Sequence, residues 1–429
     1  MEIATLYTYF KECGRVTTDT RNCPEGSMFI ALKGETFNGN AFAKQALEKG
    51  CRYAVVDEVQ YADDPNIFLV DDCLKTLQML AREHRHQMGT PIVGITGTNG
   101  KTTTKELIAT VLQKRYNVLY TQGNLNNHIG VPLTLLGLTE EHEMAVVEMG
   151  ANHPGEIRTL VNIAEPDCGL ITNVGKAHLE GFGSFEGVVK TKSELYDYLR
   201  SKENAFIFLD KDNHVLCDAS AGLKSIGYGL EGDDLYIKGK LHACAPFLAF
   251  EWEHEGKTYD VNTHLIGAYN VKNALVAIAI GCHFEVPAEA ICEALNGYIP
   301  SNNRSQLTET KDNHLIVDAY NANPTSMMAA LENFRLMEVS HKVAILGDMK
   351  ELGEGSVDEH RKIVSFLEGC GFERIILVGD EFGKANSDFE WYKNTDDLKA
   401  KISEEKISGK FVLIKGSNSM KLAPLKDIL

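Results

Sequence analysis

Gly94-Ile-Thr-Gly-Thr-Asn-Gly-Lys-Thr-Thr103 is the stretch that decides the fold. The apolar run Pro91–Thr96 predicts a strand that leads into it, and the amphipathic run Lys101–Arg115 predicts a helix that follows. Its glycines let backbone N–H groups turn toward phosphate oxygens, and the helix N-terminus adds positive potential. Although Ile95 departs from the common G-x-x-x-x-G-K-T spacing, the strand, loop and helix predict a nucleotide-binding P-loop.

Four polar side chains are expected to lie beside the phosphates. Lys101 would neutralise charge on the β- and γ-phosphates, and the Thr102 hydroxyl would bind Mg²⁺. Glu148 lies in the predicted strand Ala145–Met149, near its carboxyl end, where ligands of open α/β sheets gather. His178 follows the next predicted strand, Gly169–Val174, and reaches the same edge. Each of these last two is either a metal ligand or an ordinary surface residue.

Lys192 occupies an unusual position in the predicted helix Phe185–Arg200. At about 100° per residue it falls on the apolar face between Val188 and Leu195, whereas Glu194 is expected to face solvent. A lysine among apolar side chains is costly unless its amine finds a partner or loses its charge. Two hypotheses stay open: the amine reaches water at the rim of this face, or it is neutral and CO₂ carbamylates it to make a metal ligand.

Two asparagines begin an otherwise apolar helix. Asn270 and Asn273 lie three residues apart, so both amides lie on one face of its first turn, where they could read an adenine edge. The alternative for Asn270 is a helix N-cap.

The 429 residues are too many for one compact core. Apolar runs that alternate with amphipathic helices predict an α/β protein with mostly parallel sheets, and a small antiparallel insert is expected over 234–266. Three domains are predicted: a small α/β domain over 1–88, a central ATP-binding domain over 89–300 and a Rossmann-like domain over 301–429.

Composition excludes several classes of protein. The net charge of −17 argues against binding to nucleic acid or to anionic membranes. No run approaches the about 18 apolar residues of a membrane span, and the N-terminus does not have the pattern of a secretory signal. Ten cysteines without a C-x-x-C pair are typical of reduced thiols, so a cytoplasmic location is expected.

Motifs of one enzyme family run along the whole chain. They are Gly123-Asn-Leu-Asn-Asn-His-Ile-Gly-Val-Pro, Glu148-Met-Gly-Ala-Asn-His-Pro-Gly-Glu-Ile, Asp318-Ala-Tyr-Asn-Ala-Asn-Pro-Thr-Ser-Met and Leu346-Gly-Asp-Met-Lys-Glu-Leu-Gly. Together with the P-loop they resemble the Mur ligases, ATP-dependent amino-acid or peptide ligases of bacterial cell-wall synthesis. The resemblance implies that the first domain binds UDP, the second binds ATP, and the third brings the incoming amine.

The resemblance also implies the roles of individual residues. Thr102 and Glu148 would hold one Mg²⁺ and His178 a second, with Lys192 carbamylated as a further ligand. The implied nucleotide contacts are Gly97, Thr98, Asn99, Gly100, Lys101, Thr102, Thr103, Asn270, Asn273, Arg304 and Asp318. The implied substrate contacts are Asp19, Thr20, Arg21, Asn124, Asn321, Lys415 and Ser417. Because Asn418 stands where relatives often carry arginine, the group that holds the dipeptide carboxylate stays open, with Lys415 as a candidate.

Within the family, the stretches after Glu148 and Asp318 are most similar to members that join D-alanyl-D-alanine to UDP-N-acetylmuramoyl-tripeptide. This implies a monomeric enzyme that uses ATP and Mg²⁺, forms an acyl phosphate, and releases ADP and phosphate. Whether the third peptide residue is diaminopimelate or lysine stays open.

Three other functions fit the sequence less well. Folylpolyglutamate synthase begins near its P-loop, whereas a long segment precedes the P-loop here. The ligase that adds the third amino acid carries an Asp-Asn-Pro-Arg motif, which is absent from 301–429. A nucleotide-binding protein without catalysis would be expected to lack one of Lys101, Glu148, His178 and Lys192, and all four are present.

The substitution Lys101→Ala should abolish ATP-dependent ligation. Lys101 is the only cation of the P-loop, and loss of such a charge lowers turnover by about 100-fold or more. Phosphate release measures the effect, and unchanged turnover would refute the phosphate assignment.

Overall fold

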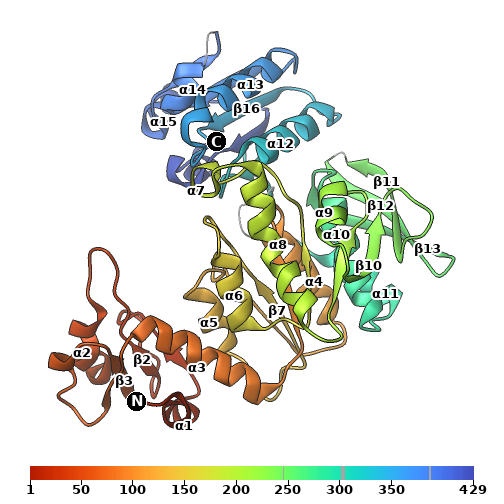
Figure 1. Cartoon of the computed structure of the whole chain (residues 1–429). Helices are drawn as coiled ribbons and strands as arrows, with labels where there is room; N and C mark the ends of the chain where they lie inside the picture. The colour runs from red at the N-terminus through yellow and green to blue at the C-terminus, as the bar shows by residue number, and fades with distance from the viewer. Residues whose placement is uncertain (245, 301–303, 305, 386–387) are drawn as a thin grey trace.

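The computed structural model describes residues 1–429 except 245, 301–303, 305 and 386–387, and three β-sheets form within the described residues (Figure 1). We name the surrounding regions the N-terminal part (β1–β4), the central part (β5–β13) and the C-terminal part (β14–β19). Most neighbouring strands are parallel, and helices connect them. The predicted α/β class is therefore confirmed.

The N-terminal sheet has four parallel strands in the order β1-β2-β3-β4. Its strands are β1 (Val16–Thr17), β2 (Met28–Ile30), β3 (Tyr53–Val56) and β4 (Ile67–Leu69), and its helices are α1 (Ile3–Cys13), α2 (Ala43–Glu48) and α3 (Cys73–Met88). Asp72 caps α3 by accepting the Lys75 N–H. Helix α3 continues into the central part, where it packs against two helices (Figure 1).

The central sheet has the order β13-β12-β11-β10-β9-β8-β5-β7-β6. Its strands are β5 (Ile92–Thr96), β6 (Val118–Tyr120), β7 (Met144–Glu148), β8 (Cys168–Ile171), β9 (Phe206–Asp210), β10 (Lys224–Gly229), β11 (Ile237–Cys244), β12 (Phe247–His254) and β13 (Lys257–Ile266). Its helices are α4 (Lys101–Leu112), α5 (Gly130–Leu135), α6 (Glu156–Ala164), α7 (Leu179–Phe182), α8 (Phe185–Ser201), α9 (His214–Ala219), α10 (Asn270–His283) and α11 (Ala288–Gly297). Strands β11 to β13 pair antiparallel, which confirms the predicted insert.

The P-loop strand β5 lies inside the sheet, with β7 on one side and β8 on the other. Ile95 pairs with Glu148, and Thr96 pairs with Ile171. The carboxyl ends of three parallel strands therefore meet beside the P-loop, at the point where the chain order reverses.

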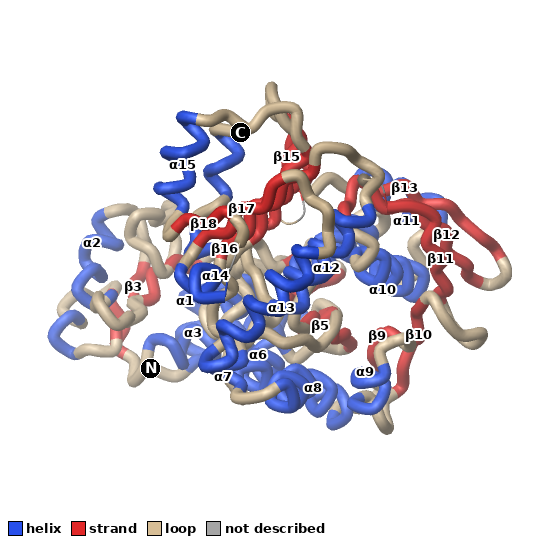
Figure 2. Tube along the Cα trace, turned by 90° about the horizontal axis from the view of Figure 1, so that it is seen from above, coloured by secondary structure: helices blue, strands red, loops and turns tan. Residues whose placement is uncertain are grey.

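The C-terminal sheet has the order β14-β15-β19-β16-β17-β18, and only the edge strand β14 is antiparallel. Its strands are β14 (Gln306–Glu309), β15 (His314–Asp318), β16 (Lys342–Gly347), β17 (Arg374–Val378), β18 (Glu390–Tyr392) and β19 (Phe411–Lys415). Its helices are α12 (Pro324–Leu336), α13 (Ser356–Glu368), α14 (Asp380–Ala385) and α15 (Thr395–Glu404). Helices α12 and α13 cover one face and α15 the other, each over its own apolar core (Figure 2).

Three local predictions need correction. The helix predicted to Arg115 ends at Leu112, and the strand predicted to Val174 ends at Ile171. Glu194 was expected to face solvent but is buried. Its carboxylate accepts the N–H groups that begin α6, because those donors have no partner inside that helix. Among the described residues, no helix combines the length and apolar character needed to cross a membrane.

His84 joins the N-terminal and central parts through two buried hydrogen bonds. Its Nε2 lies 2.9 Å from the Leu138 carbonyl oxygen, which can only accept, so Nε2 carries the proton. Its Nδ1 then accepts from the Tyr7 hydroxyl at 3.0 Å. Burial lowers the pKa of His84, so the folded protein holds the ring in its neutral form.

Acidification should weaken the fold through His84. The stabilising effect of the neutral ring is complete above the pKa of an unfolded histidine, about 6.5, and is lost as the pH falls toward the lower pKa of the folded ring. The urea midpoint of the native chain should therefore decline over this range, and that of His84→Gln should decline less. His214, an exposed histidine of α9, supplies the control His214→Gln. Equal slopes for the native chain and His84→Gln would contradict this account.

Candidate active site

A cavity of about 850 Å³ lies where the three parts meet. Leu74 and Gln78 of α3 line it from the N-terminal part. The predicted site residues among its lining are Thr98, Asn99, Gly100, Lys101, Thr102, Thr103, Asn124, Glu148, His178, Asn270, Asn273, Arg304, Asp318, Asn321 and Lys415. The structure therefore gathers most of the sequence-derived candidates around one space.

The other predicted site residues are not part of this lining. They are Asp19, Thr20, Arg21, Gly97, Lys192 and Ser417. Asp19 and Arg21 pair at 2.8 Å in the turn after β1, and hydrogen bonds from Arg21 lower the pKa of Asp19 to about 2. Asp19 and Thr20 are half-buried and Arg21 is exposed.

The Lys101 amine lies folded over the P-loop. Its Nζ donates to the carbonyl oxygens of Gly97 at 2.8 Å and Thr98 at 3.0 Å. Burial lowers the pKa of Lys101 to about 8, against the attraction of the Glu148 carboxylate. Gly97 has φ of +142°, and a Cβ there would lie 2.1 Å from the Thr172 hydroxyl oxygen, so only glycine fits. The loop thus holds a half-buried amine beside backbone that can receive phosphate.

The two oxygens of the Glu148 carboxylate differ in their hydrogen bonds. Its side chain is 1% exposed, and Oε1 accepts from the Thr102 hydroxyl at 3.3 Å and from the Asn126 amide at 2.8 Å. Within the described part of the chain, the buried Oε2 has no hydrogen-bond partner. A buried polar atom without a partner costs about 1–3 kcal/mol. A hydroxyl and a free carboxylate oxygen fit a hard cation such as Mg²⁺.

Lys192 is 2% exposed, so its amine does not reach water at the rim of the apolar face, and that hypothesis is wrong. Its Nζ donates to the Ala151 carbonyl oxygen at 3.1 Å and lies 5.2 Å from the centre of the Phe182 ring. Burial, with the nearby charge of Lys101, lowers the pKa of Lys192 well below its usual range. This shift favours the neutral, nucleophilic form of the amine more than in water.

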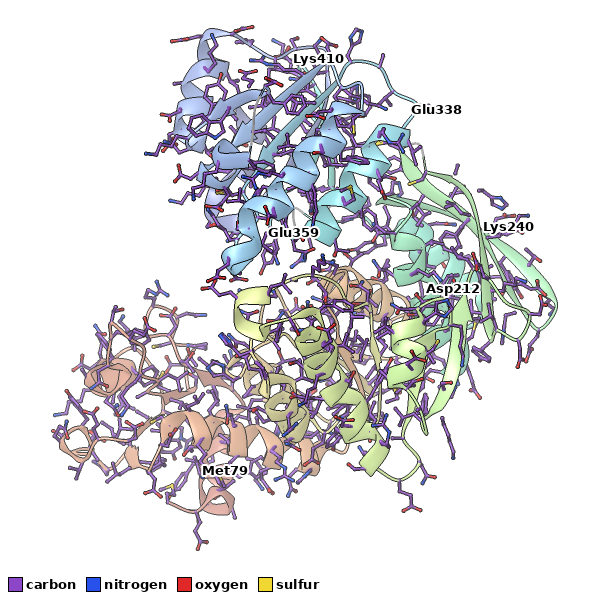
Figure 3. The ribbon with its side chains drawn as sticks, turned by 45° about the horizontal axis from the view of Figure 1, so that its top comes forward. Met79, Asp212, Lys240, Glu338, Glu359 and Lys410 are labelled. Carbon is purple, nitrogen blue, oxygen red and sulfur yellow. The ribbon has the colours of Figure 1, made fainter. Side chains whose placement is uncertain are left out.

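The loop after β8 carries contacts to the C-terminal part. His178 adopts a left-handed backbone conformation, with φ of 50°, and its Nδ1 is hydrogen-bonded to the Glu351 carboxylate. Burial lowers the pKa of His178, against the opposite effect of Glu351. Lys176 pairs with Glu359 at 3.3 Å, and Glu359 lies on the side of the C-terminal part that faces the central part (Figure 3).

The two asparagines of α10 lie beside the P-loop. Asn270 is the first residue of α10 rather than its cap, and its Nδ2 donates to the Ile266 carbonyl oxygen at 2.8 Å. Asn273 donates to Asn270 Oδ1 at 2.8 Å. A Cβ on Gly100 would lie 2.9 Å from the Asn273 side chain, so the P-loop approaches these amides closely. The capping hypothesis for Asn270 is wrong.

Residues of the C-terminal part complete the cavity. Lys415, which is 1% exposed, pairs with Asp318 at 2.5 Å. The Arg304 guanidinium lies 4.0 Å from the centre of the Tyr320 ring. Asn323 donates to Asn99 Oδ1 at 2.7 Å, which joins the cap of α12 directly to the P-loop.

Sequence reasoning missed Lys105, Asn126 and Asn323. Lys105 lies one turn after Lys101 and is 1% exposed; its nearest carboxylate oxygen, on Glu106, is 3.7 Å away. Burial lowers the pKa of Lys105, opposed chiefly by the charge of Glu148. The helical-face test that singled out Lys192 would also have found Lys105. Both asparagines lie in motifs quoted from the sequence, but the sequence does not show which residues they contact, because their partners lie far along the chain.

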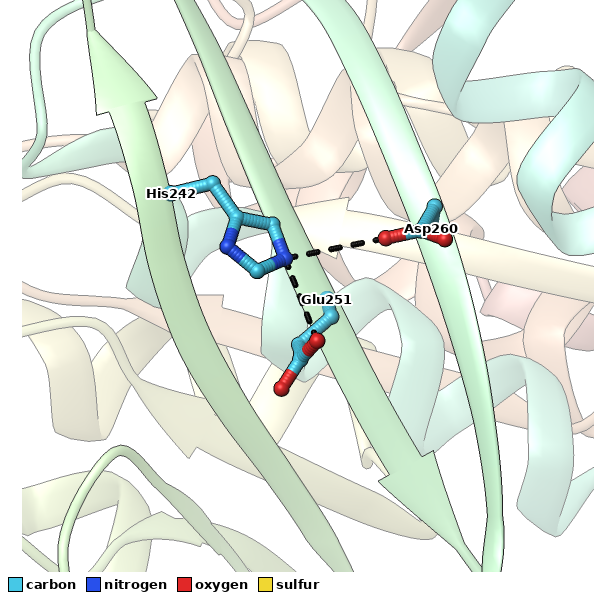
Figure 4. Close-up of side chains that lie close together, drawn as sticks. All are labelled: His242, Glu251 and Asp260. Atoms are coloured by element: carbon cyan, nitrogen blue, oxygen red, sulfur yellow. Dashed lines mark ion pairs between the residues drawn. The ribbon is translucent and has the colours of Figure 1, made fainter.

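A separate cluster of charged side chains lies on the antiparallel insert. His242 Nε2 lies 3.1 Å from Glu251 and 3.6 Å from Asp260, on adjacent strands (Figure 4). Lys240 also contacts Glu251 at 3.1 Å, and the Asp260 side chain is 77% exposed. These are surface ion pairs across strands, with a lysine already beside the central carboxylate.

Comparisons with known proteins cover the same regions. Family models match residues 13–85 (Mur ligase family, catalytic domain), 95–281 (Mur ligase middle domain) and 303–418 (Mur ligase, glutamate ligase domain). A UDP-N-acetylmuramoyl-tripeptide–D-alanyl-D-alanine ligase of Bacillus subtilis is 36% identical over 96% of this chain and 93% of its own. A structure of MurF from Acinetobacter baumannii is similar with a TM-score of 0.88 and 29% identity, over 99% of this chain and 97% of that one. A structure of MurF ligase from Thermotoga maritima in complex with ADP is similar with a TM-score of 0.86 and 28% identity, over 96% of each chain.

Proposed function

Because the chain belongs to the Mur ligase family, we propose that it joins D-alanyl-D-alanine to UDP-N-acetylmuramoyl-tripeptide at the expense of ATP. One observation carries the proposal: the P-loop, the partnerless Glu148 oxygen and residues of the C-terminal part line the same cavity. Relatives named for this reaction match nearly the whole chain. The product would be the UDP-linked pentapeptide, with release of ADP and phosphate.

Chemical activation of the tripeptide carboxylate is the first step. Its oxygen attacks the γ-phosphorus of ATP, which gives an acyl phosphate and ADP. This activation is needed because a free carboxylate cannot expel oxide when an amine attacks it. Lys101 would leave the loop carbonyls to pair with the transferring phosphoryl oxygens. When bound at Thr102 and Glu148, Mg²⁺ supplies charge neutralisation at the phosphates.

Amide formation is the second step. The free amine of D-alanyl-D-alanine attacks the acyl carbon, a tetrahedral intermediate forms, and phosphate leaves. Burial favours neutral His178, the form required both of a metal ligand and of a proton acceptor. Contacts of the C-terminal part with the P-loop and the His178 loop would exclude water, which hydrolyses acyl phosphates.

The remaining assignments follow the three parts. Residues 1–88 would bind the UDP moiety through Asp19, Thr20 and Arg21, residues 89–300 would bind ATP, and residues 301–429 would receive the dipeptide. Asn270 and Asn273 would read adenine, and Arg304 and Asp318 would contact the nucleotide from the C-terminal part. Asn124, Asn321, Lys415 and Ser417 would contact the peptide substrates. A cytoplasmic monomer suits this role.

Phosphate release should require all three substrates. With ATP and Mg²⁺, the protein should release phosphate at a steady rate only when UDP-N-acetylmuramoyl-tripeptide and D-alanyl-D-alanine are both present, because each step consumes one of them. A coupled phosphate assay with each substrate omitted in turn measures this. If no phosphate is released with any acceptor, the result would instead support a nucleotide-binding protein without catalysis.

Lys192→Ala should lose most activity and recover part of it in acetate or bicarbonate. We propose that the neutral amine adds to CO₂, forms a carbamate and releases one proton, so that a small carboxylate can partly replace the missing group. Lys190→Ala, at an exposed position of the same helix, is the matched control and should keep the native rate. A full rate for Lys192→Ala would refute the role.

A further inference from the structure

We propose that Asn126 is a positioning residue that aims Glu148 at the metal. The inference rests on the proposed function, since it concerns the Mg²⁺ that accompanies ATP. Asn126 Nδ2 donates to Glu148 Oε1 at 2.8 Å, and this is the shorter of the two hydrogen bonds that Oε1 accepts. Asn126 also lines the cavity.

The two oxygens of Glu148 have different surroundings. Oε1 is occupied by the Asn126 amide and the Thr102 hydroxyl, whereas the equally buried Oε2 has no partner among the described residues. A carboxylate turns about its last bond unless one oxygen is held. The Asn126 amide therefore fixes which oxygen stays available, and it does so without adding charge that would compete for the cation.

Backbone contacts hold Asn126 itself in place. The Gly150 N–H donates to the Asn126 carbonyl oxygen at 2.8 Å, and the Glu148 N–H donates to the Thr121 hydroxyl at 3.0 Å. A Cβ on Gly150 would lie 3.1 Å from the Asn126 amide group, so the segment after β7 and the loop before α5 are in close contact. The segment from Thr121 to Asn126 is thus fastened to the chain at Glu148 and at Gly150.

Metal binding separates this role from a merely structural one. We would titrate the full chain with Mn²⁺ in the presence of ADP and follow free Mn²⁺ by electron paramagnetic resonance. Asn126→Leu keeps the volume but removes the donor, and should raise the Kd for Mn²⁺ about tenfold while the melting temperature stays near native. Asn66→Leu, at an exposed position of the N-terminal part, is the matched control and should leave the Kd unchanged.

A double-mutant cycle tests whether Asn126 acts through Glu148. In the Glu148→Gln background, adding Asn126→Leu should weaken Mn²⁺ binding little further, because the group that it positions is already lost. Additive losses would overturn the inference, as would an unchanged Kd in Asn126→Leu. If the leucine variant does not fold, Asn126→Ala gives the same cycle. A native chain that binds ADP but no Mn²⁺ would instead overturn the metal assignment of the proposed function.

Discussion

The position of β5 between β7 and β8 is the constraint on which the site depends. Parallel pairing places the P-loop, the Glu148 carboxylate and the loop toward His178 at the carboxyl ends of three adjacent strands. A shift of one residue in the β5–β7 register would turn Glu148 to the other face of the sheet. The apolar residues of these strands, all buried, hold that register by packing on both faces.

Two buried lysines and the half-buried Lys101 give the site its electrostatic character. Burial lowers the pKa of Lys101, Lys105 and Lys192, and Lys101 lies close enough to Lys192 to add to the effect there. Glu148 is the carboxylate that most opposes the shift in the first two. A ligand that brings several negative charges, such as a nucleotide polyphosphate, would stabilise the charged form of these amines. The charge of the site is therefore suited to a ligand with several negative charges.

Contacts between the central and C-terminal parts fall on the same loops that carry the chemistry. Asn323 reaches the P-loop, and Glu351 reaches His178. The part proposed to receive the dipeptide thus lies directly against the part proposed to bind ATP. Since an acyl phosphate hydrolyses in water, such direct contact joins substrate capture to protection of the intermediate.

Local patterns in the sequence determined the α/β class, the P-loop, the antiparallel insert and the place of Lys192 on an apolar helix face, because strand and helix periodicity are properties of neighbouring residues. Motif resemblance pointed to the family that the comparisons confirm. Only the tertiary structure decided that Asn126 holds Glu148, that Lys415 pairs with Asp318, and that Glu194 is buried as a cap for α6. These contacts join residues that lie far apart in the chain. Strand register and helix packing bring them together, and no short stretch of sequence encodes either.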